Sequence, residues 1–238
     1  MAAPAPTPEP GNWPAPIRAV AFDMDGLMVN TEELYSIVGD VLLRRRGKHF
    51  TPELKREMMG LPGPQAYQVM IERSGVDATP DELAAEADAI FHDLLPSRLE
   101  PLPGLYAILS RLESREIPCC VATSSSRRFA TRVLRGIDVA DRFQFLVTAE
   151  DVPRGKPYPD IYLAAAQKFG IPPQQMMVLE DSQNGVRAAA EAGALTIAVP
   201  GAESRDHDFS AAHCIARSLV DPLVLRYFDS PSRSASSA

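Results

Sequence analysis

The fold of this protein is decided by the stretch AVAFDMDG, residues 19–26. Its first four residues are apolar and are typical of a short strand buried inside a sheet. The apolar run stops at Asp23 and Asp25, which are followed by a glycine. Burying a carboxylate costs several kcal/mol unless a cation or hydrogen-bond donors offset the cost, so this acid pair favours a hard cation such as Mg²⁺. Either acid could instead cap a helix or face solvent, and partners elsewhere in the chain must decide.

The composition limits the classes of function. With 238 residues, 45% of them hydrophobic, the chain can form one sizeable core or a core domain with a smaller insert. A formal net charge of −7 argues against nonspecific binding of nucleic acid or of an anionic membrane. No apolar stretch approaches the roughly 20 residues of a membrane span, and the N-terminus lacks the pattern of a signal peptide. The three cysteines do not form a disulfide framework, which predicts a reducing, cytoplasmic location.

Short apolar runs alternate with helical patterns along most of the chain. The runs lie at residues 18–22, 118–122, 176–179 and 195–199, and residues 145–147 could form a fifth. Apolar residues at helical spacing occupy residues 104–115, 127–134, 160–169 and 185–192. This alternation predicts an α/β fold with a doubly wound, Rossmann-like parallel sheet. In such a sheet, ligands bind beyond the carboxyl ends of the strands.

One long segment interrupts the alternation. Residues 31–100 show no convincing strand, and they contain helical patterns at 31–46, 52–59, 64–74 and 80–95. The segment is too long for a simple crossover between strands, so we interpret it as an inserted α-helical cap. The predicted domains are a proline-rich flexible arm (1–16), a core (17–30 and 101–228), the cap (31–100) and a disordered tail (229–238).

Three further polar motifs follow the predicted strands or precede helices. Residues 123–126 are a threonine and three serines, which could hold an anion or simply cap a helix. Lys156 lies between a glycine and a proline, where it could neutralise a phosphoryl group, although most lysines are solvated surface charges. Glu180 and Asp181 form a second acid pair at the end of a strand. A doubly wound sheet would bring all these motifs to one edge, which capping alone does not explain.

These motifs resemble the four motifs of the haloacid dehalogenase superfamily. The resemblance rests on Asp23 and Asp25 with the following glycine, the Thr123 turn, Lys156 with Pro157, and the acid pair at 180–181. It covers roughly residues 17–220. The chain is most similar to the subgroup with a helical cap between the first two motifs, which includes β-phosphoglucomutase, 2-deoxyglucose-6-phosphate phosphatase and pseudouridine-5′-phosphatase. The motif set is specific for the superfamily and much less specific for the substrate.

The resemblance implies a role for each catalytic residue. Asp23 would attack phosphorus and form an aspartyl-phosphate, and Asp25 would protonate the leaving alkoxide and then activate water. Thr123 and the N–H of Ser124 would hold the phosphate oxygens, while Lys156 would bridge the phosphate and the nucleophile.

The resemblance also implies a Mg²⁺ cofactor. The ion would be held by the side chains of Asp23, Asp181 and Glu180 and by the backbone carbonyl of Asp25. The dehalogenases of the superfamily lack the second aspartate of the opening pair, so Asp25 favours phosphate chemistry.

The cap would cover the site and contact the substrate. Candidate contacts are Tyr35, Gln65 and the turn at residues 59–63, although all of these could serve only to pack the cap. Asn30 replaces an aspartate found in many relatives, which predicts an effect on the hinge. Tyr35 occupies a position where β-phosphoglucomutase has a histidine, and Leu61 replaces a residue that is often basic or polar in relatives that bind sugar phosphates. Both departures argue against a mutase that forms a bisphosphate.

Three functions remain open at this stage. The first is a Mg²⁺-dependent phosphatase that acts on a small phosphorylated metabolite, such as a sugar or nucleoside monophosphate. The second is a mutase of the β-phosphoglucomutase type. The third is an interaction protein that keeps the fold as a scaffold and uses its proline-rich arm, which would require a broken motif. The expected partner is the small-molecule substrate, with no nucleic acid and no membrane, and the expected oligomeric state is a monomer.

Overall fold

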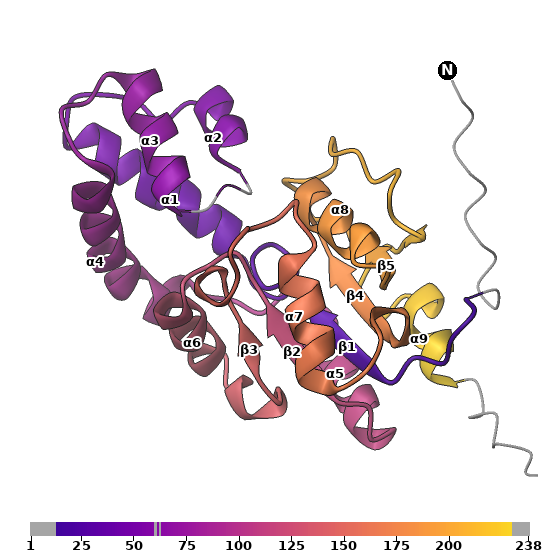
Figure 1. Cartoon of the computed structure of the whole chain (residues 1–238). Helices are drawn as coiled ribbons and strands as arrows, with labels where there is room; N and C mark the ends of the chain where they lie inside the picture. Colours follow the sequence, from indigo (N-terminus) through magenta and orange to yellow (C-terminus); the bar gives the residue numbers. More distant parts are fainter. Residues whose placement is uncertain (1–12, 60, 62, 230–238) are drawn as a thin grey trace, which may run out of the picture.

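The computed structural model describes residues 13–59, 61 and 63–229. Within these residues, parallel strands form one sheet in the order β3-β2-β1-β4-β5-β6 (Figure 1). The strands are β1 (Ala19–Phe22), β2 (Cys119–Ala122), β3 (Leu146–Val147), β4 (Met176–Glu180), β5 (Leu195–Ala198) and β6 (Cys214–Ile215). The predicted doubly wound parallel sheet is therefore confirmed. The sequence did not predict β6, because a two-residue edge strand with one exposed side chain leaves no apolar run.

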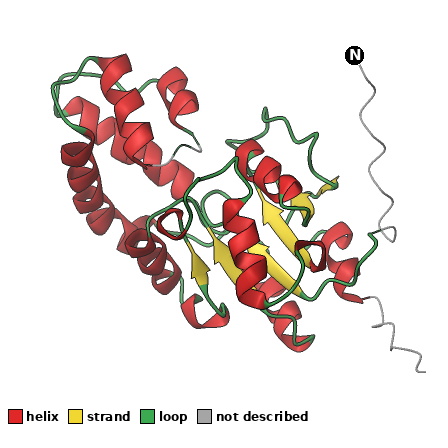
Figure 2. Ribbon diagram, viewed as in Figure 1, coloured by secondary structure: helices red, strands yellow, loops and turns green. Residues whose placement is uncertain are grey.

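Helices cover both faces of the sheet (Figure 2). On one face, α5, α6 and α9 pack with Val20 and Phe22; on the other, α7 and α8 pack with Ala21. The side chains of successive residues of β1 thus pack into hydrophobic clusters on opposite faces of the sheet, because side chains alternate along a strand. The bounds are α5 (Leu105–Ser114), α6 (Arg127–Gly136), α7 (Asp160–Phe169), α8 (Gln183–Glu191) and α9 (Pro222–Asp229), with short 3₁₀ helices η1 (Ala140–Arg142), η2 (Ala149–Asp151) and η3 (Pro173–Gln175).

Among the described residues between β1 and α5, four helices form a separate group, here named the helical lobe, beside the carboxyl ends of the strands (Figure 1). They are α1 (Thr31–Arg44), α2 (Pro52–Met58), α3 (Gly63–Ser74) and α4 (Pro80–Arg98). Thr51 and Thr79 cap α2 and α4, and each helix begins with a proline. The predicted end of the last helix at residue 95 was wrong. Pro96 lies in the last turn, where a proline removes only one backbone donor, and α4 continues through it to Arg98.

The two connections between the lobe and the sheet are bonded to each other through Asn30. The Asn30 side chain donates to the backbone oxygen of Arg98 (3.0 Å) and accepts from the backbone N–H of Glu100 (2.8 Å). The Asn30 N–H also donates to the Glu100 oxygen at 3.2 Å. An aspartate could not supply the side-chain donor, so the asparagine is suited to this position. The exact domain boundaries stay a prediction.

The ends of the chain are described only in part. Most of the predicted arm and tail, residues 1–12 and 230–238, lies outside the described residues. Trp13 packs its ring edge-on against His213, with centroids 4.6 Å apart, and its indole N–H donates to the backbone oxygen of Gln174 at 2.7 Å. Among the described helices, none has both the length and the apolar character needed to cross a membrane.

Candidate active site

The polar motifs meet at the carboxyl edge of the sheet because β1 lies between β2 and β4. Asp23 follows β1, Thr123 follows β2, and Glu180 ends β4 with Asp181 directly after it. All four side chains are buried. The order of the strands therefore brings together residues that are separated by as many as 158 positions in the chain.

Lys156 lies at the centre of this edge. Its ammonium group donates to Asp23 Oδ1 (2.5 Å), to Glu180 Oε1 (2.6 Å) and to the backbone oxygen of Ala122 (3.1 Å). Burial alone would lower the pKa of Lys156, but Asp23 and Glu180 outweigh that effect and the pKa is raised. Lys156 is therefore a charged, immobilised lysine rather than a solvated surface residue. Its peptide bond to Pro157 is cis.

Glu180 is held on both of its carboxylate oxygens. Besides Lys156, Oε1 accepts from the Tyr162 hydroxyl at 2.7 Å, and Oε2 accepts from the N–H (3.0 Å) and the hydroxyl (2.9 Å) of Ser182. A Cβ on Gly185 would overlap this carboxylate, so α8 approaches it closely only because that residue is glycine. These bonds hold the Glu180 carboxylate in place beside the ammonium group of Lys156.

Asp25 is bound through one oxygen only. Its Oδ2 accepts from the hydroxyls of Ser125 (2.8 Å) and Thr123 (3.2 Å), whereas Oδ1 is buried and has no partner among the described residues. Burial raises the pKa of Asp25, and the hydroxyl groups oppose the shift. Gly26 follows with a φ of +77°, and a Cβ there would lie 2.5 Å from Asp181 Oδ2, so the turn requires glycine.

Asp23, Glu180 and Asp181 form a cluster that could hold a cation. One carboxylate oxygen from each lies within 4.8 Å of the others. Burial raises the pKa of Asp181 well above its usual range, and the charge of Asp23 adds to the shift. Burial likewise raises the pKa of Asp23, although Lys156 opposes the shift. A divalent cation would offset this crowding of negative charge, and carboxylate oxygens are the ligands that hard cations prefer. Three of the four predicted metal ligands are thus brought together, and the part assigned to the Asp25 carbonyl stays a prediction.

A cavity of about 620 Å³ separates this edge from the helical lobe. Asp23, Asp25, Ser124, Lys156 and Asp181, which are all among the predicted site residues, line its sheet side. Thr123 does not line it, since its hydroxyl is buried, donates to Asp25 and accepts from the N–H of Ser125 at 3.0 Å. A direct contact between Thr123 and phosphate therefore stays a prediction.

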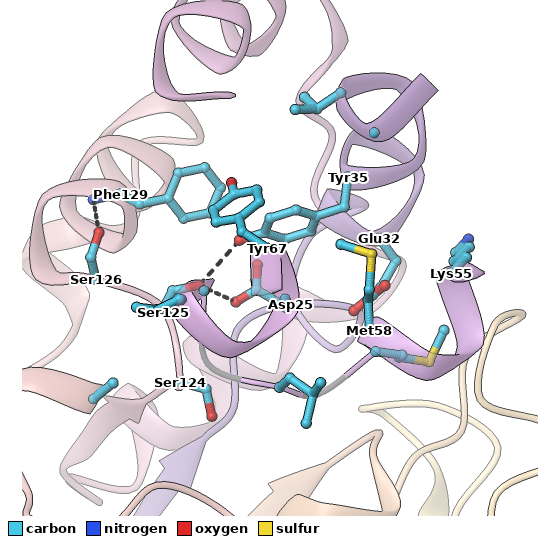
Figure 3. Close-up of a pocket in the computed structure, with 18 of the residues that line it drawn as sticks. Asp25, Glu32, Tyr35, Lys55, Met58, Tyr67, Ser124, Ser125, Ser126 and Phe129 are labelled. Atoms are coloured by element: carbon cyan, nitrogen blue, oxygen red, sulfur yellow. Dashed lines mark hydrogen bonds between the residues drawn. The ribbon is translucent and has the colours of Figure 1, made fainter. Parts of the chain in front are cut away.

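The lobe side of the cavity includes only part of the predicted contacts. Tyr35 lines the cavity, and its hydroxyl lies 3.4 Å from Ser125 Oγ (Figure 3). Met59, Leu61 and Gly63 of the predicted turn also line it, while residues 60 and 62 lie outside the described residues. Gln65 is exposed on α3 and is not among the lining residues, so the structure does not support its predicted contact with substrate.

Several residues of the site are not singled out by any motif in the sequence. Ser125 makes the shorter bond to Asp25, although in the sequence it is only one member of a hydroxyl-rich turn. Tyr162 supports Glu180, and its one signal in the sequence is a hydroxyl on the buried face of a helix. Glu32 lines the cavity, and burial together with the charge of Asp25 raises its pKa to about 7. Tyr67 lines the lobe side.

The lobe and the core are joined across the cavity by ion pairs and rings. Lys55 of α2 lies 2.7 Å from Glu203. Asp88 of α4 pairs with Arg128 (2.7 Å) and Arg132 (3.3 Å) of α6. In addition, the rings of Tyr35, Phe91 and Phe129 pack against one another with centroids 4.9–5.8 Å apart. The cavity is thus enclosed between two parts of the molecule that contact each other directly.

Comparison with known proteins identifies the class to which this fold and site belong. The family model of haloacid dehalogenase-like hydrolases matches residues 20–199, and the chain belongs to this family. The resemblance inferred from the motifs is therefore confirmed.

Two relatives of similar length have names that state a reaction. The chain is 34% identical over 213 residues to (DL)-glycerol-3-phosphatase 2 of Arabidopsis thaliana, covering 86% of this chain and 88% of the relative. It is 33% identical over 206 residues to a probable pseudouridine-5′-phosphatase of Drosophila melanogaster, covering 84% of this chain and 89% of the relative. Both relatives are named as phosphatases.

Solved structures show the same architecture. CbbY from Rhodobacter sphaeroides, in complex with phosphate, matches with a TM-score of 0.78 and 25% identity, over 90% of this chain and 99% of CbbY. A putative β-phosphoglucomutase from Thermotoga maritima matches with a TM-score of 0.72 and 27% identity, over 90% of this chain and 100% of the Thermotoga maritima chain.

Proposed function

We propose that this protein is a Mg²⁺-dependent phosphatase that hydrolyses a small phosphorylated metabolite through an aspartyl-phosphate. The observation that carries the proposal is the position of Lys156, whose ammonium group lies 2.5 Å from Asp23 Oδ1 and 2.6 Å from Glu180 Oε1 at the buried edge of the sheet. A buried carboxylate held beside a fixed cation is suited to approach a phosphate dianion, because the cation reduces their mutual repulsion. Membership of the hydrolase family and the phosphatase relatives support the same reaction class.

Asp23 is the nucleophile in this proposal. Its Oδ1 is bound by Lys156, and the other carboxylate oxygen attacks phosphorus. Asp25 lies on the same turn, with one oxygen anchored by Ser125 and the other without a partner within the described part of the chain. The raised pKa of Asp25 suits a group that first donates a proton to the leaving alkoxide and then takes a proton from water.

The phosphate oxygens are held by the turn after β2 and by Lys156. Ser124 lines the cavity at the end of β2, and the resemblance to the family implies that its N–H donates to a phosphate oxygen. Mg²⁺ would be held by the side chains of Asp23, Asp181 and Glu180 and by the backbone carbonyl of Asp25, and the Glu180 carboxylate is also held in place by its own hydrogen bonds. When bound, the ion polarises the phosphoryl group and offsets the negative charge of the carboxylates.

A phosphosugar mutase is the alternative reaction. It would need the phosphorylated enzyme to transfer its phosphoryl group to a second sugar hydroxyl instead of to water. Tyr35 lies beside Asp25, bonded through Ser125, and supplies no base of the kind that a histidine would provide there. Hydrolysis is therefore the favoured reaction.

The test is phosphate release from acetyl phosphate, p-nitrophenyl phosphate and a panel of phosphorylated metabolites. Asp23→Asn keeps an oxygen that can accept from Lys156, and it should lower kcat/KM on the order of 10³-fold or more while the protein stays folded. Asp141→Asn, at an exposed position of η1, is the matched control and should retain activity. Full activity of Asp23→Asn would exclude the mechanism, and glucose 6-phosphate formed from β-glucose 1-phosphate without phosphate release would favour the mutase.

A further inference from the structure

The wall of the cavity that faces Asp25 is aromatic, and both the helical lobe and α6 contribute to it. Figure 3 shows the rings of Tyr35, Tyr67 and Phe129 gathered on one side of the Asp25 carboxylate, and Met58 lies on another. The alkoxide that leaves during hydrolysis must form next to Asp25, because this residue supplies its proton. The body of the leaving group therefore lies among these side chains.

The charges around the cavity are unsuited to a second anionic group. Among the described lining residues, the ammonium groups are those of Lys55 and Lys156, and both are already paired with carboxylates. His207 lines the cavity as well, and burial lowers its pKa, which favours the neutral imidazole. Glu32 and Glu150 also line the cavity, so a further phosphate or carboxylate on the substrate would meet repulsion.

Tyr67 supplies a polar contact within this apolar wall. It is half-buried on α3, and its hydroxyl has no hydrogen-bond partner among the described residues. Burial and the nearby charge of Asp88 raise the pKa of Tyr67 to about 12, so the hydroxyl keeps its proton and can donate it to an acceptor on a ligand.

We propose that the substrate is a phosphate monoester of an alcohol that carries an uncharged, largely apolar planar ring, which stacks against Tyr35, Tyr67 and Phe129. The inference rests on the proposed phosphatase function. Water cleaves the P–O bond overall, and the products are inorganic phosphate and the ring-bearing alcohol, whose oxygen receives the proton of Asp25. Aromatic side chains favour offset or edge-on contacts with planar rings, whereas the hydroxyls of a sugar would lose their hydrogen bonds to water on this wall. A cavity of about 620 Å³ has room for such a ring beside the phosphate.

The first experiment compares four phosphate esters of primary alcohols, so that the intrinsic reactivity of the leaving groups is similar. They are benzyl phosphate, cyclohexylmethyl phosphate, glucose 6-phosphate and fructose 1,6-bisphosphate. We expect kcat/KM to be highest for benzyl phosphate, at least about tenfold above glucose 6-phosphate, and lowest for the bisphosphate. Equal or better use of glucose 6-phosphate or of the bisphosphate overturns the inference, and a preference for the non-planar cyclohexylmethyl ester overturns the assignment of a planar ring.

The second experiment tests whether Tyr67 causes the preference for benzyl phosphate over glucose 6-phosphate. Tyr67→Ala should lower the ratio of kcat/KM for benzyl phosphate to that for glucose 6-phosphate about tenfold, while Tyr67→Phe keeps the ring and should keep most of the ratio. Tyr106→Ala, a partly exposed tyrosine of α5 outside the cavity, is the matched control and should leave the ratio unchanged. Melting temperatures show that each variant is folded, and an unchanged ratio in folded Tyr67→Ala contradicts the proposal.

Acetyl phosphate separates this inference from the proposed function, since its leaving group has no ring. Hydrolysis of acetyl phosphate together with indifference to the ring of the ester overturns only the inference. No hydrolysis of acetyl phosphate or of any ester overturns the proposed function, and the inference with it.

Discussion

The sheet side and the lobe side of the cavity differ in both chemistry and order. On the sheet side, Lys156 and Glu180 are buried and make several short hydrogen bonds each. On the lobe side, Tyr35 and Tyr67 contribute rings and hydroxyls that are weakly bonded or unbonded within the described residues. A tightly bonded wall is suited to one fixed reaction, whereas an apolar wall selects by shape and hydration. Changes on the sheet side should therefore affect every substrate alike, and changes on the lobe side should alter the choice among substrates.

Removal of divalent cations should have the largest effect and should not depend on the substrate. We expect a chelator to reduce phosphate release from all esters to background, and added Mg²⁺ to restore it, because Asp23 and Asp181 lie together in a buried acidic cluster. Activity that persists at full level after exhaustive chelation would contradict a metal-dependent sheet side.

The same cluster predicts a dependence of stability on pH. Burial raises the pKa of Asp23 and Asp181 in the folded state, so without a cation their protonated forms favour folding, and the melting temperature should fall as the pH rises through these raised values. Protons compete with Mg²⁺ for the same oxygens, so the stabilisation by Mg²⁺ should shrink as the pH falls. Thermal melts with and without Mg²⁺ between pH 5 and 8 would measure both effects; a stabilisation that is independent of pH would place the ion elsewhere.

Lys156→Met should lower activity toward all esters by at least about 10²-fold, because the cation beside Asp23 is lost. The free energy of unfolding should also fall by about 3–5 kcal/mol, since two carboxylates remain buried without their partner. Adding Asp23→Asn and Glu180→Gln to the same variant should recover stability but not activity. If the triple variant is no more stable than the single one, the carboxylates are not the source of the loss.

Asn30→Asp tests the connection between the two sides. The substitution removes the donor to the Arg98 oxygen and brings a carboxylate close to that carbonyl, so we expect a loss of about 1 kcal/mol in stability. That loss corresponds to a fall of roughly 2–4 °C in melting temperature for a chain of this size. Asn30→Ala, which removes both side-chain bonds, is the comparison variant. A melting temperature for Asn30→Asp at or above the wild-type value would show that the donor is dispensable.

Tyr35→Phe should have the smallest effect. The hydroxyl lies 3.4 Å from Ser125 Oγ, at the long end of hydrogen bonding, whereas the ring packs against Phe91 and Phe129. We expect kcat/KM to change by less than about threefold for any ester, because the ring is kept. A large loss that is shared by all esters would assign Tyr35 to the catalytic sheet side instead.

The sequence was most informative where local pattern and chemistry agree. Asp23, Lys156 and Asp181 follow apolar runs or lie between residues that fix the backbone, and the parallel sheet brings them together as expected. The helical lobe was also predicted, with its helix starts marked by prolines and threonines. Gln65 lacked such a signal, since helix phase alone does not tell which side of α3 faces a cavity formed with another part of the chain.

What the sequence determined by itself is the set of strands and the chemistry at their ends, because buried strands and carboxylates each carry a strong local signature. Only the tertiary structure decided which hydrogen-bond partner each of those polar groups has. It bonds the Thr123 hydroxyl to Asp25 and uses Glu180, with Tyr162, to hold Lys156. It also places the tyrosine rings of the lobe opposite Asp25. The reason is physical: a buried polar atom bonds whichever partner the packing brings within about 3 Å, and no spacing along the chain specifies that partner.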